Sequence, residues 1–153
     1  MSAAPAALAT ANTAPVTNAA VEPASLDGTW QGTIYFDKEG FLADTSTPVA
    51  GIRFRIEIHD VVVRVFVEQD GAFRESKPGK FHIAPLSANA VIFATDEDEG
   101  NWVESWSFVV TVKGKDLMIA EYTRLVNNIS VPHGEKESEF ATRGAGEFSR
   151  VTP

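Results

Sequence analysis

Two neighbouring segments of this chain alternate apolar and polar residues so regularly that a β-hairpin is the structure they favour. Residues 52–58, IRFRIEI, carry large apolar side chains at every second position and charged ones between them. Residues 61–67, VVVRVFV, carry a valine at every second position. A turn at His59-Asp60 would give every apolar residue an apolar partner, and a one-residue slip would destroy that match. The expected pairs are Ile58 with Val61, Ile56 with Val63, Phe54 with Val65 and Ile52 with Val67.

The same period of two recurs from Leu26 onward. Eight runs show it, separated by turn-forming residues, and none has the period of an amphipathic helix. The runs are residues 28–36, 51–58, 61–68, 80–84, 90–95, 101–112, 116–126 and 138–151. Short strands joined by short turns predict an all-β domain, an eight-stranded antiparallel up-and-down (meander) barrel whose closure removes exposed edges. First and last strands would then be neighbours, with Gly144 and Gly146 allowing their close approach.

The length of the chain, 153 residues, suits one domain with a sizeable core. Residues 1–25 are small and proline-interrupted, which predicts a flexible tail before a barrel domain over residues 26–153. This tail lacks the positively charged start and continuous apolar stretch of a secretory signal. The expected location is therefore cytoplasmic, or periplasmic or secreted if the chain is a processed form.

The net charge of −8 and the absence of cysteine exclude several classes of function. An acidic chain without a basic cluster repels polyanions, so we expect no nucleic-acid partner. No apolar run is long enough to span a membrane. The three histidines are not spaced as metal ligands are. The acidic run Asp96 to Gly100 indicates a solvated hairpin tip rather than a calcium loop. We expect no metal and no cofactor.

Two connections are too long for simple turns, one after the first run and one before the last. In a meander barrel both would lie at the same end. The first contains Phe41 and Leu42, which could fold over that end as a lid.

The triplet Gly28-Thr29-Trp30, at the start of the first run, resembles the G-x-W signature of the lipocalin and wider calycin barrels. The resemblance implies that Trp30 closes one end of the barrel and packs against an arginine from a late strand, Arg150 or alternatively Arg124. It extends over the barrel from Leu26 to Val151. The T-D-Y signature of lipocalins and a helix after the last strand are missing, so the chain is similar to a minimal bacterial-type calycin rather than a standard lipocalin.

One charged residue, Glu104, shares a face with apolar residues in the run 101–112. A carboxylate there must be paired, exposed at the rim or functional. Its surroundings depend on the turn after Val112. A two-residue loop would place Trp106 opposite Thr123, Phe108 opposite Glu121 and Glu104 opposite Leu125. A three-residue loop, which we favour because it buries fewer unpaired charges, places Trp106 opposite Arg124 and Phe108 opposite Tyr122.

These features favour a barrel that binds a small apolar or amphipathic ligand. The residues expected to contact it are Trp30, Phe41, Phe54, Trp106, Phe108, Tyr122 and Arg124. The alternative is a protein-binding or inhibitor module that meets a basic protein, such as a lysozyme, through its acidic loops. The third possibility is a barrel enzyme of the cyclase or isomerase type, which would use Glu104, Tyr122 and Arg124.

Overall fold

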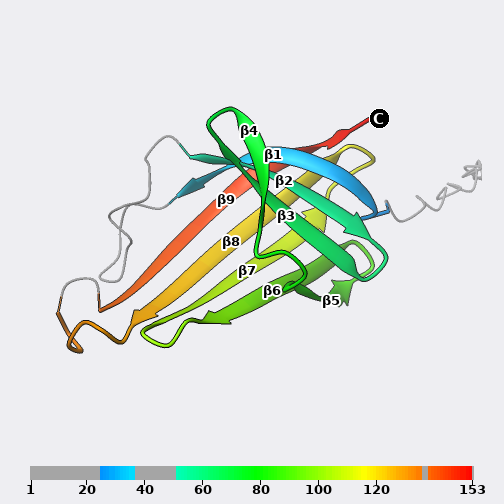
Figure 1. Cartoon of the computed structure of the whole chain (residues 1–153). Coiled ribbons are helices and arrows are strands. Elements are labelled where there is room, and N and C mark those ends of the chain that lie inside the picture. Colours follow the sequence, from blue (N-terminus) through cyan, green and yellow to red (C-terminus); the bar gives the residue numbers. More distant parts are fainter. Residues whose placement is uncertain (1–24, 37–50, 136–137, 153) are drawn as a thin grey trace, which may run out of the picture.

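The computed structural model describes residues 25–36, 51–135 and 138–152, and all the regular structure in them is β-strand (Figure 1). The nine strands are β1 (Gly28–Phe36), β2 (Ile52–His59), β3 (Val62–Gln69), β4 (Ala72–Ser76), β5 (His82–Ser87), β6 (Ala90–Asp98), β7 (Trp102–Val112), β8 (Leu117–Asn128) and β9 (Glu139–Val151). No helix that could cross a membrane occurs among these residues.

All nine strands belong to one antiparallel sheet in the order β4-β3-β2-β1-β9-β8-β7-β6-β5. Consecutive strands pair everywhere except between β4 and β5, and β1 pairs with β9, so that Trp30 lies opposite Arg150. The expected contact between the first and last strands is thereby confirmed.

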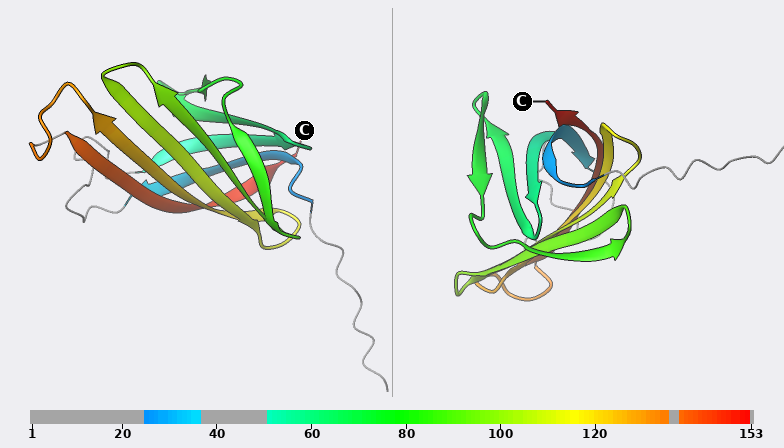
Figure 2. Two further views of the ribbon diagram at one scale, coloured as in Figure 1. Left: turned by 90° about the horizontal axis from the view of Figure 1, so that it is seen from below. Right: turned by 90° about the vertical axis from the view of Figure 1, so that its right-hand side faces the viewer.

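The expectation of a closed, eight-stranded barrel is wrong on both counts. The sheet has nine strands and curls into an incomplete cylinder whose two edges, β4 and β5, do not pair (Figure 2). Both edges are poor partners for a ladder of hydrogen bonds. Strand β4 has only five residues, and β5 carries Pro85, which has no N–H to donate, followed by a shift of register between Pro85 and Ser87.

Strand β4 is the additional strand. The alternation of apolar and polar residues did not predict it, because its large apolar residue faces outward. Only Phe73 is large and apolar in AFRES, and it lies opposite Glu68 on the outer face of the sheet. The turn before it, Asp70-Gly71, has positive φ at both residues, 51° and 76°. An Asp-Gly pair between two runs is a strong hairpin signal in its own right and could have revealed this strand.

The hairpin of β2 and β3 forms with the expected faces but a different register. Ile58 pairs with Val63 rather than Val61, and Ile56 pairs with Val65. The turn is therefore Asp60-Val61, with a φ of 53° at Asp60, and Val61 is exposed. A shift of two residues keeps every side chain on its face, which explains why the alternation alone did not distinguish the two registers.

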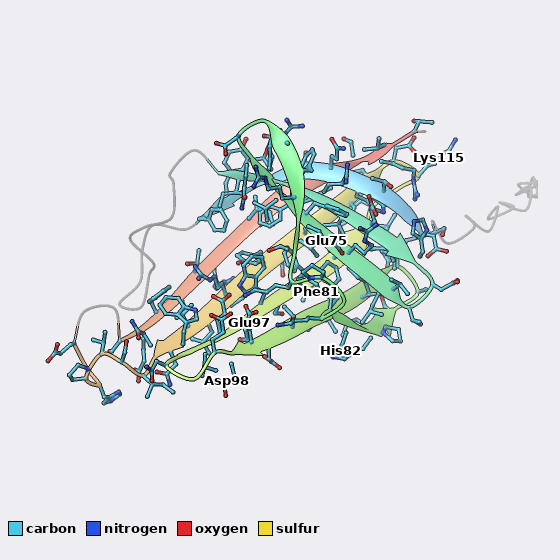
Figure 3. All side chains as sticks on the ribbon, in the orientation of Figure 1. Glu75, Phe81, His82, Glu97, Asp98 and Lys115 are labelled. Atoms are coloured by element: carbon cyan, nitrogen blue, oxygen red, sulfur yellow. The ribbon has the colours of Figure 1, made fainter. Side chains whose placement is uncertain are left out.

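The core fills the concave side of the curled sheet. Its largest fully buried side chains come from strands on both halves of the sheet: Trp30, Phe54, Phe93, Phe108 and Phe148. Phe81, from the β4–β5 connection, is also buried and packs edge-on against Phe93 inside the curve of the sheet (Figure 3). The interior is therefore largely solid.

The two long connections leave the sheet at the same end, as expected. The end of β1 and the start of β2 lie there, together with the end of β8 and the start of β9 (Figure 1). Phe41 and Leu42, the residues expected to form a lid, lie outside the described residues.

Candidate functional site

A pocket of about 100 Å³ opens into the concave side of the sheet near this end. Its walls are mostly apolar and come from β1, β2, β3, β7, β8 and β9. The lining residues are Phe36, Ile52, Phe54, Val67, Trp106, Tyr122, Arg124 and Thr142. The pocket thus brings together four of the residues expected to bind a ligand, Phe54, Trp106, Tyr122 and Arg124.

The ring of Tyr122 forms the centre of the pocket wall. It meets Phe36 and Trp106 edge-on at 5.8 Å between ring centroids, and Phe54 at 5.9 Å. Phe108 lies 4.8 Å from it on the side of the core. Aromatic pairs at these separations stabilise each other beyond the area they bury, so the wall is held in place before any ligand arrives.

The hairpin of β7 and β8 supplies three of these aromatic side chains, Trp106, Phe108 and Tyr122, together with Arg124. Trp106 lies opposite Arg124 and Phe108 opposite Tyr122, as the three-residue loop Gly114 to Asp116 requires. The favoured register is therefore confirmed. Because side chains alternate between faces, this register directs all four residues to the concave side.

Glu104 is buried, with 6% of its surface exposed, and it is paired. Its Oε2 accepts hydrogen bonds from Arg124 Nε at 3.0 Å and Nη2 at 2.7 Å, and from Trp102 Nε1 at 3.3 Å. Its Oε1 accepts one from Lys77 Nζ. Burial on its own raises the pKa of Glu104, but the hydrogen bonds from Lys77 and Arg124 outweigh it and hold the pKa below its usual value.

Lys77 links the edge strand β4 to the opposite half of the sheet. It follows β4 directly, and its ammonium reaches Glu104 on β7 and Glu97 on β6. Glu97, which points into the curve of the sheet in Figure 3, also pairs with Lys80 at 3.0 Å. An ionic cluster of three cations and two carboxylates, Lys77, Lys80, Arg124, Glu97 and Glu104, therefore spans the gap that no strand pairing closes.

Trp30 and Arg150 meet at the other end of β1, away from the pocket. The guanidinium lies over the indole ring, 4.1 Å from its centroid. Arg150 also donates hydrogen bonds to the carbonyl oxygens of Lys115 at 2.9 Å and Ser25 at 2.6 Å, and to that of Asp27. Trp30 is six residues from Phe36, roughly 20 Å along the strand, so it does not contact the pocket.

We expect Arg150→Lys to lower the free energy of unfolding by about 1–2 kcal/mol, because an ammonium cannot stack on Trp30 and reach three carbonyls together. Urea denaturation followed by tryptophan fluorescence measures the loss. Arg143→Lys, at an exposed position of the same strand, is the matched control. Equal stabilities of the two variants would contradict this role of Arg150.

The remaining expected site residues fall into two groups. Phe108 is fully buried behind the pocket and Trp30 lies at the far end, so neither lines it. Phe41 lies outside the described residues. The alternation pattern gave no special weight to Thr142, Ile52 or Val67, and Lys77 was missed because it reaches Glu104 across a separation of 27 residues.

The acidic tip is a hydrogen-bonded turn between β6 and β7. Asp98 accepts a hydrogen bond from the Gly100 N–H at 2.8 Å, and Asp96, Asp98 and Glu99 are exposed. Within the described ranges no group of histidine and acidic side chains is placed to hold a metal ion. No protein-family model matches the chain, and no curated protein matches it either.

Proposed function

We propose that this protein binds a small apolar or amphipathic molecule on the concave side of its sheet, in the manner of a lipocalin-like barrel. The observation that supports this is the pocket, an aromatic and aliphatic cavity with one charged residue, Arg124, at its wall. Binding pockets of this composition, mostly apolar with a few polar groups, are the usual form of small-molecule sites.

The volume of the pocket limits the size of the ligand that it can hold. Its 100 Å³ is well below the range of about 300–1,000 Å³ that is usual for drug-sized ligands. A cavity of about 150 Å³ in another protein holds one benzene ring. The pocket is smaller than that cavity but is open on one side, so we propose a ligand of one ring with a small substituent, or a short branched chain, part of which stays outside the pocket.

We expect one-ring compounds such as ethylbenzene and acetophenone to bind saturably, and a fluorescent long-chain fatty acid analogue not to bind. Ligand-observed saturation-transfer NMR and fluorescence titration measure the two. Val67→Phe fills the pocket and should weaken one-ring binding at least tenfold, whereas Val62→Phe on the exposed side of the same strand should not. The proposal fails if no one-ring compound binds, or if Val67→Phe leaves binding unchanged.

A second candidate, binding of a basic protein through the acidic tip, is supported by the exposure of Asp96, Asp98 and Glu99. Glu97 is not available for it, since its carboxylate already pairs with Lys77 and Lys80. Replacing the three exposed acids by their amides should abolish capture of lysozyme on a column of this protein, and unchanged capture would count against the candidate.

The contacts of Glu104 argue against the cyclase or isomerase alternative. Both its oxygens accept hydrogen bonds from cations, and its lowered pKa keeps it ionised. A general acid or base needs a pKa near the working pH and an oxygen that can reach the substrate.

A further inference from the structure

A row of polar side chains crosses the wall of the pocket. Thr95 on β6 lies opposite Trp106 on β7, Trp106 opposite Arg124 on β8, and Arg124 opposite Thr142 on β9. All four point to the concave side, between the aromatic row of Phe93, Phe108 and Tyr122 and the acidic pair of Glu97 and Glu104. Three of the four, Trp106, Arg124 and Thr142, line the pocket.

Three members of this row carry a buried polar atom without a hydrogen-bond partner. They are Thr95 Oγ1, Trp106 Nε1 and Thr142 Oγ1. In the rest of the described chain, only Arg55 Nε is also buried without a hydrogen-bond partner. Thr95 and Thr142 are 2% and 4% exposed. Buried polar atoms are normally paired, and an unpaired one costs free energy. Since Trp106 and Thr142 both line the pocket, their unpaired atoms indicate a place where a bound molecule supplies the missing partner.

We infer that this row recognises an uncharged hydrogen-bond acceptor, such as a carbonyl or ether oxygen, on the small apolar ligand proposed above. An indole N–H only donates, so the partner of Trp106 must accept. A hydroxyl both donates and accepts, so Thr142, which lines the same pocket, can also donate to an oxygen of the ligand. The apolar body of the ligand then lies against Phe54, Ile52 and Val67.

The charges around the row favour a neutral group. Arg124 Nε and Nη2 are both engaged by Glu104 Oε2. A ligand carboxylate at this point would have to compete with Glu104 for Arg124, and a buried carboxylate without a cation of its own costs free energy. A neutral oxygen can accept hydrogen bonds from Trp106 and Thr142 without that cost.

The inference rests on the proposed function, and a matched set of probes separates the two. Ethylbenzene and acetophenone have nearly the same shape and differ in the carbonyl oxygen, and benzoate adds a negative charge. We expect acetophenone to bind about tenfold more tightly than ethylbenzene, since one net hydrogen bond contributes about that factor. Benzoate should bind more weakly than acetophenone. Protein-observed NMR titration of the full chain measures all three.

The tryptophan indole N–H signals supply a readout specific to the row. Trp30 Nε1 already donates to the Leu26 carbonyl at 2.9 Å and Trp102 Nε1 to Glu104, so acetophenone should move only the Trp106 signal downfield. The Trp106→Phe variant assigns that signal by removing it. Ethylbenzene should shift it much less.

Thr142→Val tests the second member of the row. It replaces a buried, unpaired hydroxyl with a methyl group of the same shape, so the variant should fold with equal or higher stability. We expect it to weaken acetophenone binding about fivefold and to leave ethylbenzene binding unchanged.

The outcomes distinguish the two proposals. Equal affinities for acetophenone and ethylbenzene, or a benzoate affinity at or above that of acetophenone, would overturn the inference and leave the binding function standing. An unmoved Trp106 signal at saturating acetophenone would also overturn it. Failure of all three compounds to bind would overturn the proposed function, and the inference with it.

Discussion

Gly146→Ala should lower the free energy of unfolding by about 3 kcal/mol, although it adds a single methyl group. A Cβ at this position would lie 1.9 Å from the Thr33 carbonyl oxygen, on the backbone of β1. Backbone cannot move away as a flexible side chain can, so β1 and β9 must separate at this point, which lies between their two paired stretches. Since these two strands join the halves of the sheet, the whole domain should be destabilised rather than one loop.

The matched control is Gly114→Ala, the same substitution in the β7–β8 turn, where a Cβ would meet nothing within 4 Å. Urea denaturation followed by far-UV circular dichroism compares the two variants with the parent protein. The close approach of β1 and β9 is contradicted if the free energies of unfolding of the two variants differ by less than about 0.5 kcal/mol, roughly the range of neutral surface substitutions.

Glu104→Ala should lower the free energy of unfolding by about 3 kcal/mol. Removing this carboxylate leaves Arg124 and Lys77 without the partner that both share, and their side chains are only 24% and 12% exposed. It also removes the ionic link between the β4–β5 connection and β7. Glu104→Gln retains a hydrogen-bond acceptor for Arg124, so its loss should be smaller.

The pH dependence gives an independent measure of the same pairing. The pKa of Glu104 is lower in the folded protein than in the unfolded chain, so its contribution is complete above the unfolded pKa. That contribution is lost as the pH falls through the folded pKa. The slope of stability against pH below about pH 5 should therefore be shallower in Glu104→Gln than in the parent protein.

Glu75→Ala is the control for both measurements. Glu75 pairs with Arg64 on the outer face at 2.7 Å, but that arginine is half exposed. Exposed ion pairs contribute up to about 1 kcal/mol, so this variant should lose little. A loss in Glu104→Ala no greater than in Glu75→Ala would mean that the cluster does not hold the open side of the sheet.

The inner faces of the strands could be predicted because alternation depends only on local sequence. Ile34, Phe54, Ile56 and Phe108 are buried as their spacing requires. The order of the strands also followed, since hairpin-length links force neighbours to pair. The glycines of the last strand, Gly144 and Gly146, indicate its crowded contact with β1 from the sequence alone, and a Cβ at either would lie within 3 Å of the β1 backbone.

Closure could not be predicted in the same way. Whether β4 and β5 pair depends on the length of one edge, on Pro85 in the other, and on the ionic contacts of Lys77 across the gap. Each is a long-range property that alternation does not record. Strand β4 was missed because its large apolar residue, Phe73, faces outward beneath Arg53 and Arg55.

The candidate site was predicted in part for the same reasons. The β7–β8 register placed Trp106, Phe108, Tyr122 and Arg124 on one face once charge pairing was considered. Thr142 was not singled out, although the alternation of the last strand puts it on the face of Phe148. A single threonine in a strand cannot be recognised as a site residue from the sequence, because its role depends on its neighbours across the sheet.

Intermolecular nuclear Overhauser effects between acetophenone and the protein test the central claim most directly. Binding on the concave side predicts contacts from the ligand to the methyl groups of Ile52 and Val67, two walls of the pocket. Contacts to exposed residues such as Val61 or Leu86 instead, or none at saturating ligand, would contradict the account.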